Sequence, residues 1–107
     1  MLDNLVERLL ATGLTDKERI DKGIELKVSD IYYAGNVAHG IIPGIKRTHV
    51  VALNIKEGSY LCSCEDFSYR HKFCKHIIAL IKDLPDKVAN EFMGSLELLI
   101  SLMKKER

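Results

Sequence analysis

Residues 60–80 read YLCSCEDFSYRHKFCKHIIAL, and this stretch decides the fold of the chain. It contains all three cysteines of the protein, as the letters CSC at 62–64 and, after nine further residues, CKH at 74–76. Three thiolates and one imidazole form a common tetrahedral ligand set for structural zinc, whereas catalytic zinc keeps one position open for water. The pattern therefore predicts one structural Zn²⁺ ion held by Cys62, Cys64, Cys74 and His76.

The spacing of these residues indicates which elements carry them. Side chains alternate between the two faces of a strand, so Cys62 and Cys64 share a face and Ser63 points away. Positions two apart do not share a face of a helix, so we expect Cys74 at a helix cap and His76 in the first turn. The positive end of that helix and the metal both lower thiolate pKa values. We therefore expect thiolates that are already formed at neutral pH.

Three other interpretations of the cluster are weaker. Unliganded cysteines often behave as small hydrophobes, but two cysteines one residue apart and a third beside a histidine disfavour this. An iron–sulfur cluster usually takes four thiolates. In a cysteine–histidine enzyme Cys74 and His76 would act as nucleophile and base, and they lie too close along the chain for that. The sequence also lacks paired carboxylates, a Gly-rich phosphate loop and a nucleophile elbow, so we expect no enzymatic activity.

Upstream of the motif, the sequence predicts a small antiparallel sheet that ends in a hairpin. Residues 46–55 alternate polar and apolar side chains, residues 56–59 form a turn, and residues 60–61 begin the return strand. Strand-prone residues also occupy the segment from 24 to 37. One face of the clearest strand carries Val51, Leu53 and Ile55, and turns or bulges are expected at Gly35, Gly40 and Pro43-Gly44.

Helical periodicity marks both ends of the chain. Residues 2–14 repeat leucine and valine at helical spacing. Thr15 and Glu18 match a capping box, which predicts a second helix over residues 16–22 that Gly23 ends.

Downstream, residues 74–83 form an amphipathic helix, and a longer helix follows over 85–105. Its apolar coverage is wide for a surface helix. A small sheet cannot cover all of it, and an exposed apolar patch usually marks an interface. The side chains concerned are Met93, Leu96, Leu98, Leu99, Ile100, Leu102 and Met103.

Together these elements predict an α+β fold, with a small antiparallel sheet and a zinc-bound ββα finger flanked by N-terminal and C-terminal helices. A chain of 107 residues suits one domain over residues 1–107. Within it we expect a finger core at 37–82, an N-terminal helical segment at 1–23 and a C-terminal helix at 85–105.

The motif resembles the SWIM zinc finger family, whose signature is CxC, a variable spacer and CxH. The similarity extends to HVVALNI, SYLCSCEDF and the run from Cys74 to Leu80, and covers about residues 37–82. His71 is the rival ligand to His76, but it precedes the third cysteine and does not match the family signature. The resemblance implies a ββα core and an interaction module without catalysis, of a family thought to bind DNA or proteins.

The short chain resembles stand-alone SWIM proteins, including small archaeal ones, that pair with recombinase paralogs in homologous recombination. This implies an accessory factor in DNA recombination or repair that acts through a protein partner, such as a recombinase-paralog ATPase. Homo-oligomers through the terminal helices are a further expectation. The alternative is a DNA-binding zinc finger protein related to transcription or transposition.

Basic residues near the motif supply a candidate nucleic-acid surface at a helix N-terminus. Tyr69 and Phe73 lie among them and are candidates for base stacking. The competing interpretation is a solvated charged loop with Phe73 in the core, and Glu65 and Asp66 offset the positive charge. His39 and His49 are expected to have structural or surface roles. The candidate contacts are Lys46, Arg47, Arg70, Lys72 and Lys75.

Composition limits the classes of partner and the cellular compartment that we expect. The net charge is +1, whereas proteins that bind nucleic acid through bulk charge are usually much more basic. Acidic Asp3 and Glu7 stand where a signal peptide would be basic, and no apolar stretch suits a membrane span, so no membrane partner is expected. An odd number of clustered cysteines suits metal in a reducing compartment, which we take as the cytoplasm.

Overall fold

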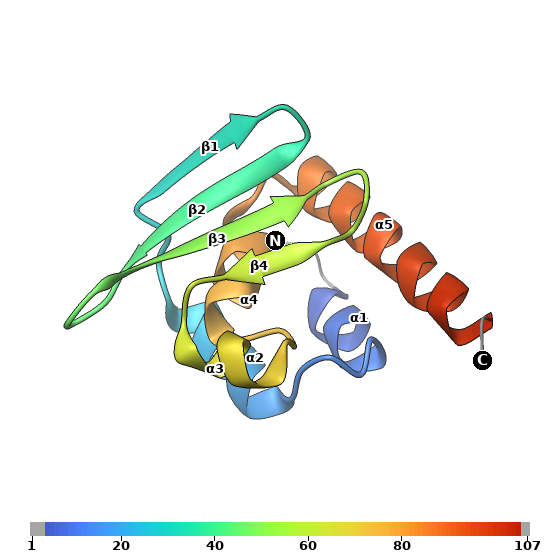
Figure 1. Ribbon diagram of the computed structural model, residues 1–107, viewed down its shortest axis with the longest axis horizontal. Helices are drawn as coiled ribbons and strands as arrows, with labels where there is room; N and C mark the ends of the chain where they lie inside the picture. The colour runs from blue at the N-terminus through green and yellow to red at the C-terminus, as the bar shows by residue number, and fades with distance from the viewer. Residues whose placement is uncertain (1–3, 106–107) are drawn as a thin grey trace.

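The computed structural model describes residues 4–105, and its four strands form one antiparallel sheet in the order β1-β2-β3-β4. Figure 1 shows β3 and β4 in front of α4, while α5 runs beside the turn between β3 and β4. The predicted α+β class, with a small antiparallel sheet and helices at both ends, is therefore confirmed. The elements are α1 (Leu5–Ala11), α2 (Lys17–Glu25), β1 (Asp30–Ala34), β2 (Val37–Pro43), β3 (Thr48–Asn54), β4 (Tyr60–Cys62), α3 (Glu65–Arg70), α4 (Lys75–Asp83) and α5 (Asp86–Lys105).

The core lies between the sheet and the helices. β3 alternates as predicted, so Val51 and Leu53 are fully buried on the face that meets the helices. Helix α4 is the centre of this core, because every side chain from His76 to Ile81 is buried. Removing such apolar side chains from water stabilises the fold by about 1.5–3 kcal/mol each.

Two glycines are contact points rather than the stop and the turn that the sequence predicted. Gly23 lies inside α2, where a Cβ atom would stand 2.7 Å from the Lys75 carbonyl oxygen and from Ile78 Cγ2. Gly40 lies in the middle of β2, where a Cβ atom would stand 2.8 Å from Leu80 Cδ1. Both positions therefore let a neighbouring element approach α4 closely, which a larger side chain would prevent.

The N-terminal helices are offset from their predicted ranges. α1 ends at Ala11 and Gly13 follows it at a φ of 73°, as a helix stop should. The Thr15 capping box is wrong, because the side chain of Asp16 accepts the capping hydrogen bond from the Arg19 N–H at 2.9 Å. The predicted helical residues 2 and 3 lie outside the described residues.

The remaining elements follow the prediction closely. The strand expected over 46–55 covers Thr48–Asn54, and the last helix begins at Asp86. The stretch from Leu26 to Ser29, which looked strand-like, is irregular and leads into β1. None of the helices within residues 4–105 is both long enough and apolar enough to cross a membrane.

Candidate metal centre

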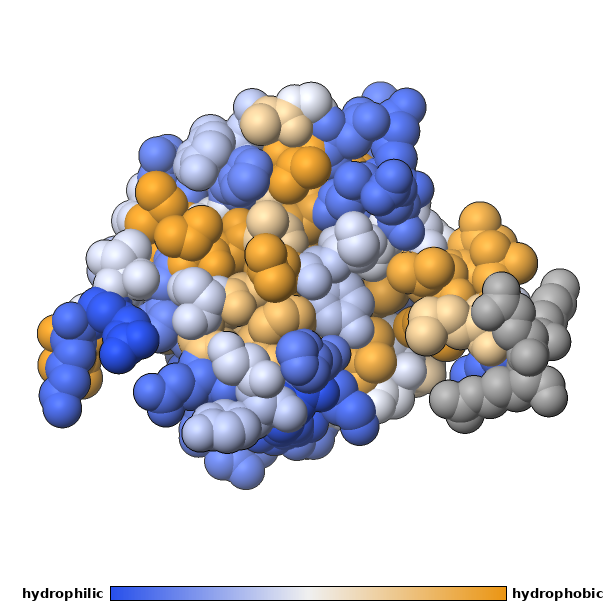
Figure 2. All heavy atoms as spheres, viewed as in Figure 1, coloured by the Kyte–Doolittle hydropathy of each residue, from blue (hydrophilic) through white to orange (hydrophobic). Residues whose placement is uncertain are grey.

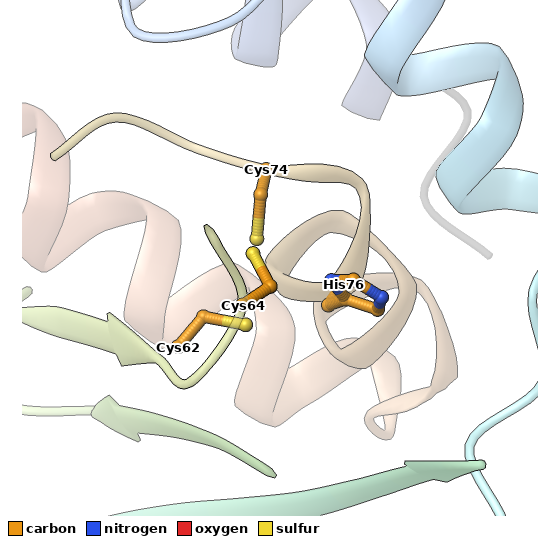
Figure 3. A group of neighbouring side chains, drawn as sticks. All are labelled: Cys62, Cys64, Cys74 and His76. Carbon is orange, nitrogen blue, oxygen red and sulfur yellow. The ribbon is translucent and has the colours of Figure 1, made fainter. Parts of the chain in front are cut away.

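The four predicted ligands come together at the junction of the sheet and the helices. The ligand atoms offered by Cys62, Cys64, Cys74 and His76 all lie within 4.8 Å of one another, and all four residues are buried (Figure 3). In a tetrahedral site with zinc–sulfur bonds of about 2.3 Å, neighbouring sulfur atoms are about 3.8 Å apart. The donor atoms therefore need only small shifts to surround one ion.

Three different elements position these side chains. Cys62 ends β4, and Cys64 two residues later is the N-cap of α3. Cys74 is the N-cap of α4 and His76 lies in its first turn, which confirms that part of the prediction. Ser63 turns the other way, because its hydroxyl accepts a hydrogen bond from the Val50 N–H at 3.0 Å. The metal therefore joins a hairpin to two helix starts.

Helix α3 was not predicted from the sequence, which indicated a charged loop. The Cys64 sulfur accepts a hydrogen bond from the Phe67 N–H at 3.4 Å, so this ligand also caps the helix. The helix ends at His71, which adopts a left-handed backbone at a φ of 52°. The available signal was acidic Glu65 and Asp66 just after a residue able to cap, which favours a helix N-terminus. Six residues are too few for periodicity to reveal the helix.

The thiols do not ionise alike in the metal-free chain. A hydrogen bond from the Cys62 thiol, aided by His76 and opposed by burial, lowers the pKa of Cys74 to about 4. That same hydrogen bond to Cys74, together with burial, raises the pKa of Cys62. Burial and the charge on Cys74 raise the pKa of Cys64, although the Phe67 N–H opposes them. Before metal binds, the shifts therefore favour a thiolate at Cys74 and thiols at Cys62 and Cys64, and the effect of zinc on all three stays a prediction.

The histidines separate into one ligand candidate and one neighbour. His76 Nδ1 is buried and has no hydrogen-bond partner within residues 4–105, as a nitrogen available to a metal would be. The His49 ring lies against it, with ring centroids 4.2 Å apart. Burial lowers the pKa of His49, and the nearby His76 and Arg47 lower it further. His71, the rival ligand, is exposed at the end of α3 with its ring against Phe67.

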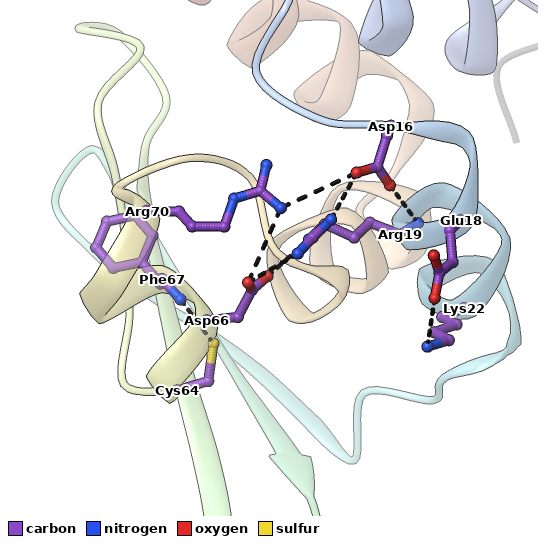
Figure 4. Close-up of polar contacts among 8 residues, drawn as sticks. All are labelled: Asp16, Glu18, Arg19, Lys22, Cys64, Asp66, Phe67 and Arg70. Atoms are coloured by element: carbon purple, nitrogen blue, oxygen red, sulfur yellow. Dashed lines mark hydrogen bonds and ion pairs between the residues drawn. The ribbon is translucent and has the colours of Figure 1, made fainter.

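An ion-pair cluster fastens α3 to α2 (Figure 4). Arg19 donates two hydrogen bonds to Asp66, from Nε at 2.8 Å and from Nη2 at 2.9 Å. It also donates to Asp16, and Arg70 lies 3.9 Å from Asp16 and 4.0 Å from Asp66. The bidentate hydrogen bonds from Arg19 hold the pKa of Asp66 below its ordinary value. The positive charge of Arg70 is thus largely matched by carboxylates.

Within residues 4–105, the other candidate nucleic-acid contacts form no ion pair with a carboxylate. Lys46 and Arg47 lie in the exposed β2–β3 hairpin, beside a hollow of about 300 Å³ that Glu65 and His49 also line. Arg47 and Lys75 both lie close enough to His49 to lower its pKa. Lys72 is exposed between α3 and α4.

The two aromatic candidates for base stacking differ sharply. Phe73 is fully buried and packs edge-on against Tyr60, with ring centroids 4.5 Å apart. Tyr69 is 84% exposed on α3. Phe73 is therefore a core residue, as the competing interpretation held, and only Tyr69 is available to a ligand.

Comparison with known proteins gives one match. Residues 49–84 match the family model of the SWIM zinc finger, and this range contains β3 apart from Thr48, all of β4, α3 and α4, and all four clustered residues. No curated protein and no solved structure matches the chain. The SWIM zinc finger is a binding module rather than a catalytic one, and the Cys₃His cluster fits one structural zinc ion. Residues 49–84 of this chain therefore form a SWIM zinc finger that binds one structural zinc ion.

Proposed function

We propose that the chain is a non-catalytic accessory factor in DNA recombination or repair, and that it acts by binding a protein partner in a reducing compartment such as the cytoplasm. The observation that supports a protein partner is the C-terminal half of α5, whose apolar side chains stay exposed. Figure 2 shows apolar side chains gathered at this end of the molecule. The zinc finger then serves as the scaffold that holds this surface in place.

The binding surface is a groove between α5, β4 and the segment that joins α1 to α2. It has a volume of about 500 Å³, and its lining is mostly apolar. Leu14 and Tyr60 form one side, while Leu99, Ile100 and Met103 project from α5 on the other. A groove of this chemistry suits an amphipathic helix that inserts apolar side chains at helical spacing. The occupant we propose is such a helix on a recombinase-paralog ATPase.

Affinity capture with the tagged, zinc-loaded full chain tests this proposal. Met103→Glu puts a charge in the groove, and Leu61→Glu puts the same charge on the far face of the sheet at similar exposure, 58% against 60%. We expect the wild type and Leu61→Glu to retain a P-loop ATPase identified by mass spectrometry, and Met103→Glu to lose it. Capture without any such ATPase, or equal retention by Met103→Glu, would refute the proposal.

A second candidate, direct DNA binding, is favoured by the exposed cations Lys46 and Arg47 in the β2–β3 hairpin and by exposed Lys75, which like Arg47 lies close enough to His49 to lower its pKa. Cations that neutralise phosphates make affinity fall steeply with salt. The triple variant with glutamine at these positions should then weaken binding and flatten the salt dependence. Lys17→Gln with Lys22→Gln is the charge control, since both lysines are paired on α2 with Asp21 and Glu18.

Fluorescence anisotropy with single-stranded and double-stranded DNA at about 50 mM and about 200 mM salt provides the measurement. A DNA-binding function requires salt-dependent affinity that the triple variant loses and the control variant keeps. Affinity that is absent at low salt, or equal in the two variants, excludes it.

A further inference from the structure

The outer face of the sheet is a broad surface that no helix of residues 4–105 covers. The register of the strands fixes which side chains share it, because directly paired residues lie on the same face. Figure 2 shows apolar side chains spread over the strands on this face, which is turned toward the viewer. The central row crosses all four strands as Tyr32, His39, Ala52 and Leu61, and the next row contains Asp30, Ile41 and Val50.

This face carries almost no charge. The four strands contain no lysine or arginine, and Asp30, at the edge of the sheet, is their only acidic residue. A nucleic acid needs cations along its backbone, so it does not suit this face. If this face packs against the same face of a second copy, no like charges meet at the centre, because the charged Asp30 lies at the edge of the sheet. The chemistry therefore favours an apolar protein surface.

The central row protrudes at one end and is hollowed at the other. The Tyr32 ring stacks on the His39 ring, with centroids 4.7 Å apart and planes 10° apart, so the two form a ridge. Ala52 comes next and is small, and it lies in the floor of a hollow of about 210 Å³. Val37 and Leu61 also line this hollow, and Leu61 is 60% exposed. A ridge and a hollow side by side make the face complementary to itself.

We propose that a second copy of this chain packs on the outer face, through a twofold axis that runs parallel to the strands between β2 and β3. Such an axis places β1 of each copy over β4 of the other, and β2 over β3. Face-to-face sheets pack about 10 Å apart with strands about 30° from parallel, so the pairing is closest near the axis. The opposed pairs are His39 with Ala52, Ile41 with Val50 and, farther out, Tyr32 with Leu61.

The size of the face sets the strength of this dimer. The four strands hold 5, 7, 7 and 3 residues, so at about 3.3 Å per residue and about 4.8 Å between strands the face covers about 350 Å². Two such faces bury about 700 Å² before surface relief is counted, which is below the about 1,200 Å² at which stable specific interfaces begin. The dimer is therefore weak and concentration-dependent, and the copies exchange readily.

Sedimentation analysis of the zinc-loaded full chain across the micromolar range tests the proposal. Ala52→Glu fills the hollow with a charge, and Leu61→Glu charges its rim. Each should raise the dimer Kd at least about tenfold, because a carboxylate buried without a partner is strongly unfavourable. Met103→Glu on α5 is the matched control and should leave the Kd unchanged. Zinc content and far-UV circular dichroism verify that each variant is folded.

A mixing experiment tests the position of the axis. His39→Lys and Ala52→Glu should each be monomeric alone, whereas a mixture should form heterodimers because lysine and glutamate then oppose each other across the interface. A chain that is monomeric at every concentration, a dimer that only Met103→Glu disrupts, or a mixture that stays monomeric would overturn the proposal. If the chain is monomeric at every concentration, the outer face does not bind a second copy, and a different protein is its remaining candidate partner.

Discussion

At the scale of single residues, Cys64 combines two roles. Its sulfur belongs to the metal cluster and also accepts the hydrogen bond that caps α3. We predict that Cys64→Ser, or removal of zinc by a chelator, unfolds the central part of the chain. Zinc contributes about 10–16 kcal/mol to the folding of zinc-finger peptides at neutral pH, whereas an ordinary domain is stable by only about 5–15 kcal/mol. Circular dichroism during heating, with and without chelator, is the measurement.

The neighbouring Ser63 supplies the matched control. It lies between the two cysteines but is exposed on the opposite side of the chain. Ser63→Ala should retain full zinc stoichiometry and lose about 1 kcal/mol or less, the value of one hydrogen bond. If the chain melts at the same temperature with and without chelator, zinc does not stabilise this fold.

The unequal thiols predict a proton release when zinc binds. Because the pKa values of Cys62 and Cys64 are raised, both are protonated at neutral pH in the metal-free chain, while Cys74 is ionised. Zinc needs three thiolates, so binding should release about two protons. Apparent affinity should then rise about a hundredfold per pH unit above neutral, until the raised pKa values are passed. Calorimetry in buffers of different ionisation enthalpy counts these protons, and a count of zero contradicts the assignment.

At the scale of elements, Gly23 determines how closely α2 approaches α4. Gly23→Ala should destabilise the protein by about 1–3 kcal/mol, because the new methyl group meets a backbone oxygen that cannot move away. Gly94 in α5 is the control, since a methyl group there would have no atom of residues 4–105 within 4 Å beyond its own helix backbone and chain neighbours. Gly94→Ala should stabilise by about 0.5–1 kcal/mol through helix propensity. Urea denaturation measures both, and equal effects would contradict the close packing.

Local sequence signals predicted some elements and could not predict others. The alternation in β3 and the helix cap at Cys74 could be predicted from the sequence, because each depends on side-chain geometry within a few residues. The close packing of Gly40 could not be predicted from the sequence, because it depends on Leu80, forty residues away. Gly23 was predicted to end a helix, because its contact with α4 involves residues far along the chain and leaves no local signal. The clustered ligands were found by spacing, whereas the coupling among their thiols required the folded arrangement.

At the scale of the whole molecule, segments outside the matched residues 49–84 complete the core of the finger. Ile20 in α2 and Phe92 in α5 are fully buried, and the Phe92 ring lies 6.5 Å from that of Phe73. The Phe73 N–H donates to the Leu14 carbonyl at 3.0 Å, which ties the approach to Cys74 to the N-terminal segment. The same dependence holds for α3, which Arg19 fastens to α2. The finger and its flanking helices therefore share one core.

This shared core predicts that the finger does not fold independently. A fragment of residues 37–82 lacks four core side chains that are each less than 2% exposed in the full chain. They are Leu9, Ile20, Phe92 and Leu96. Each such loss costs about 1.5–3 kcal/mol, and their sum approaches or exceeds the net stability of an ordinary domain. With saturating zinc, the fragment should bind metal without a cooperative thermal transition, whereas the full chain under the same conditions should melt cooperatively. Dispersed amide signals and a sharp melt in the zinc-loaded fragment would contradict this dependence on the shared core and make the flanking helices separable additions.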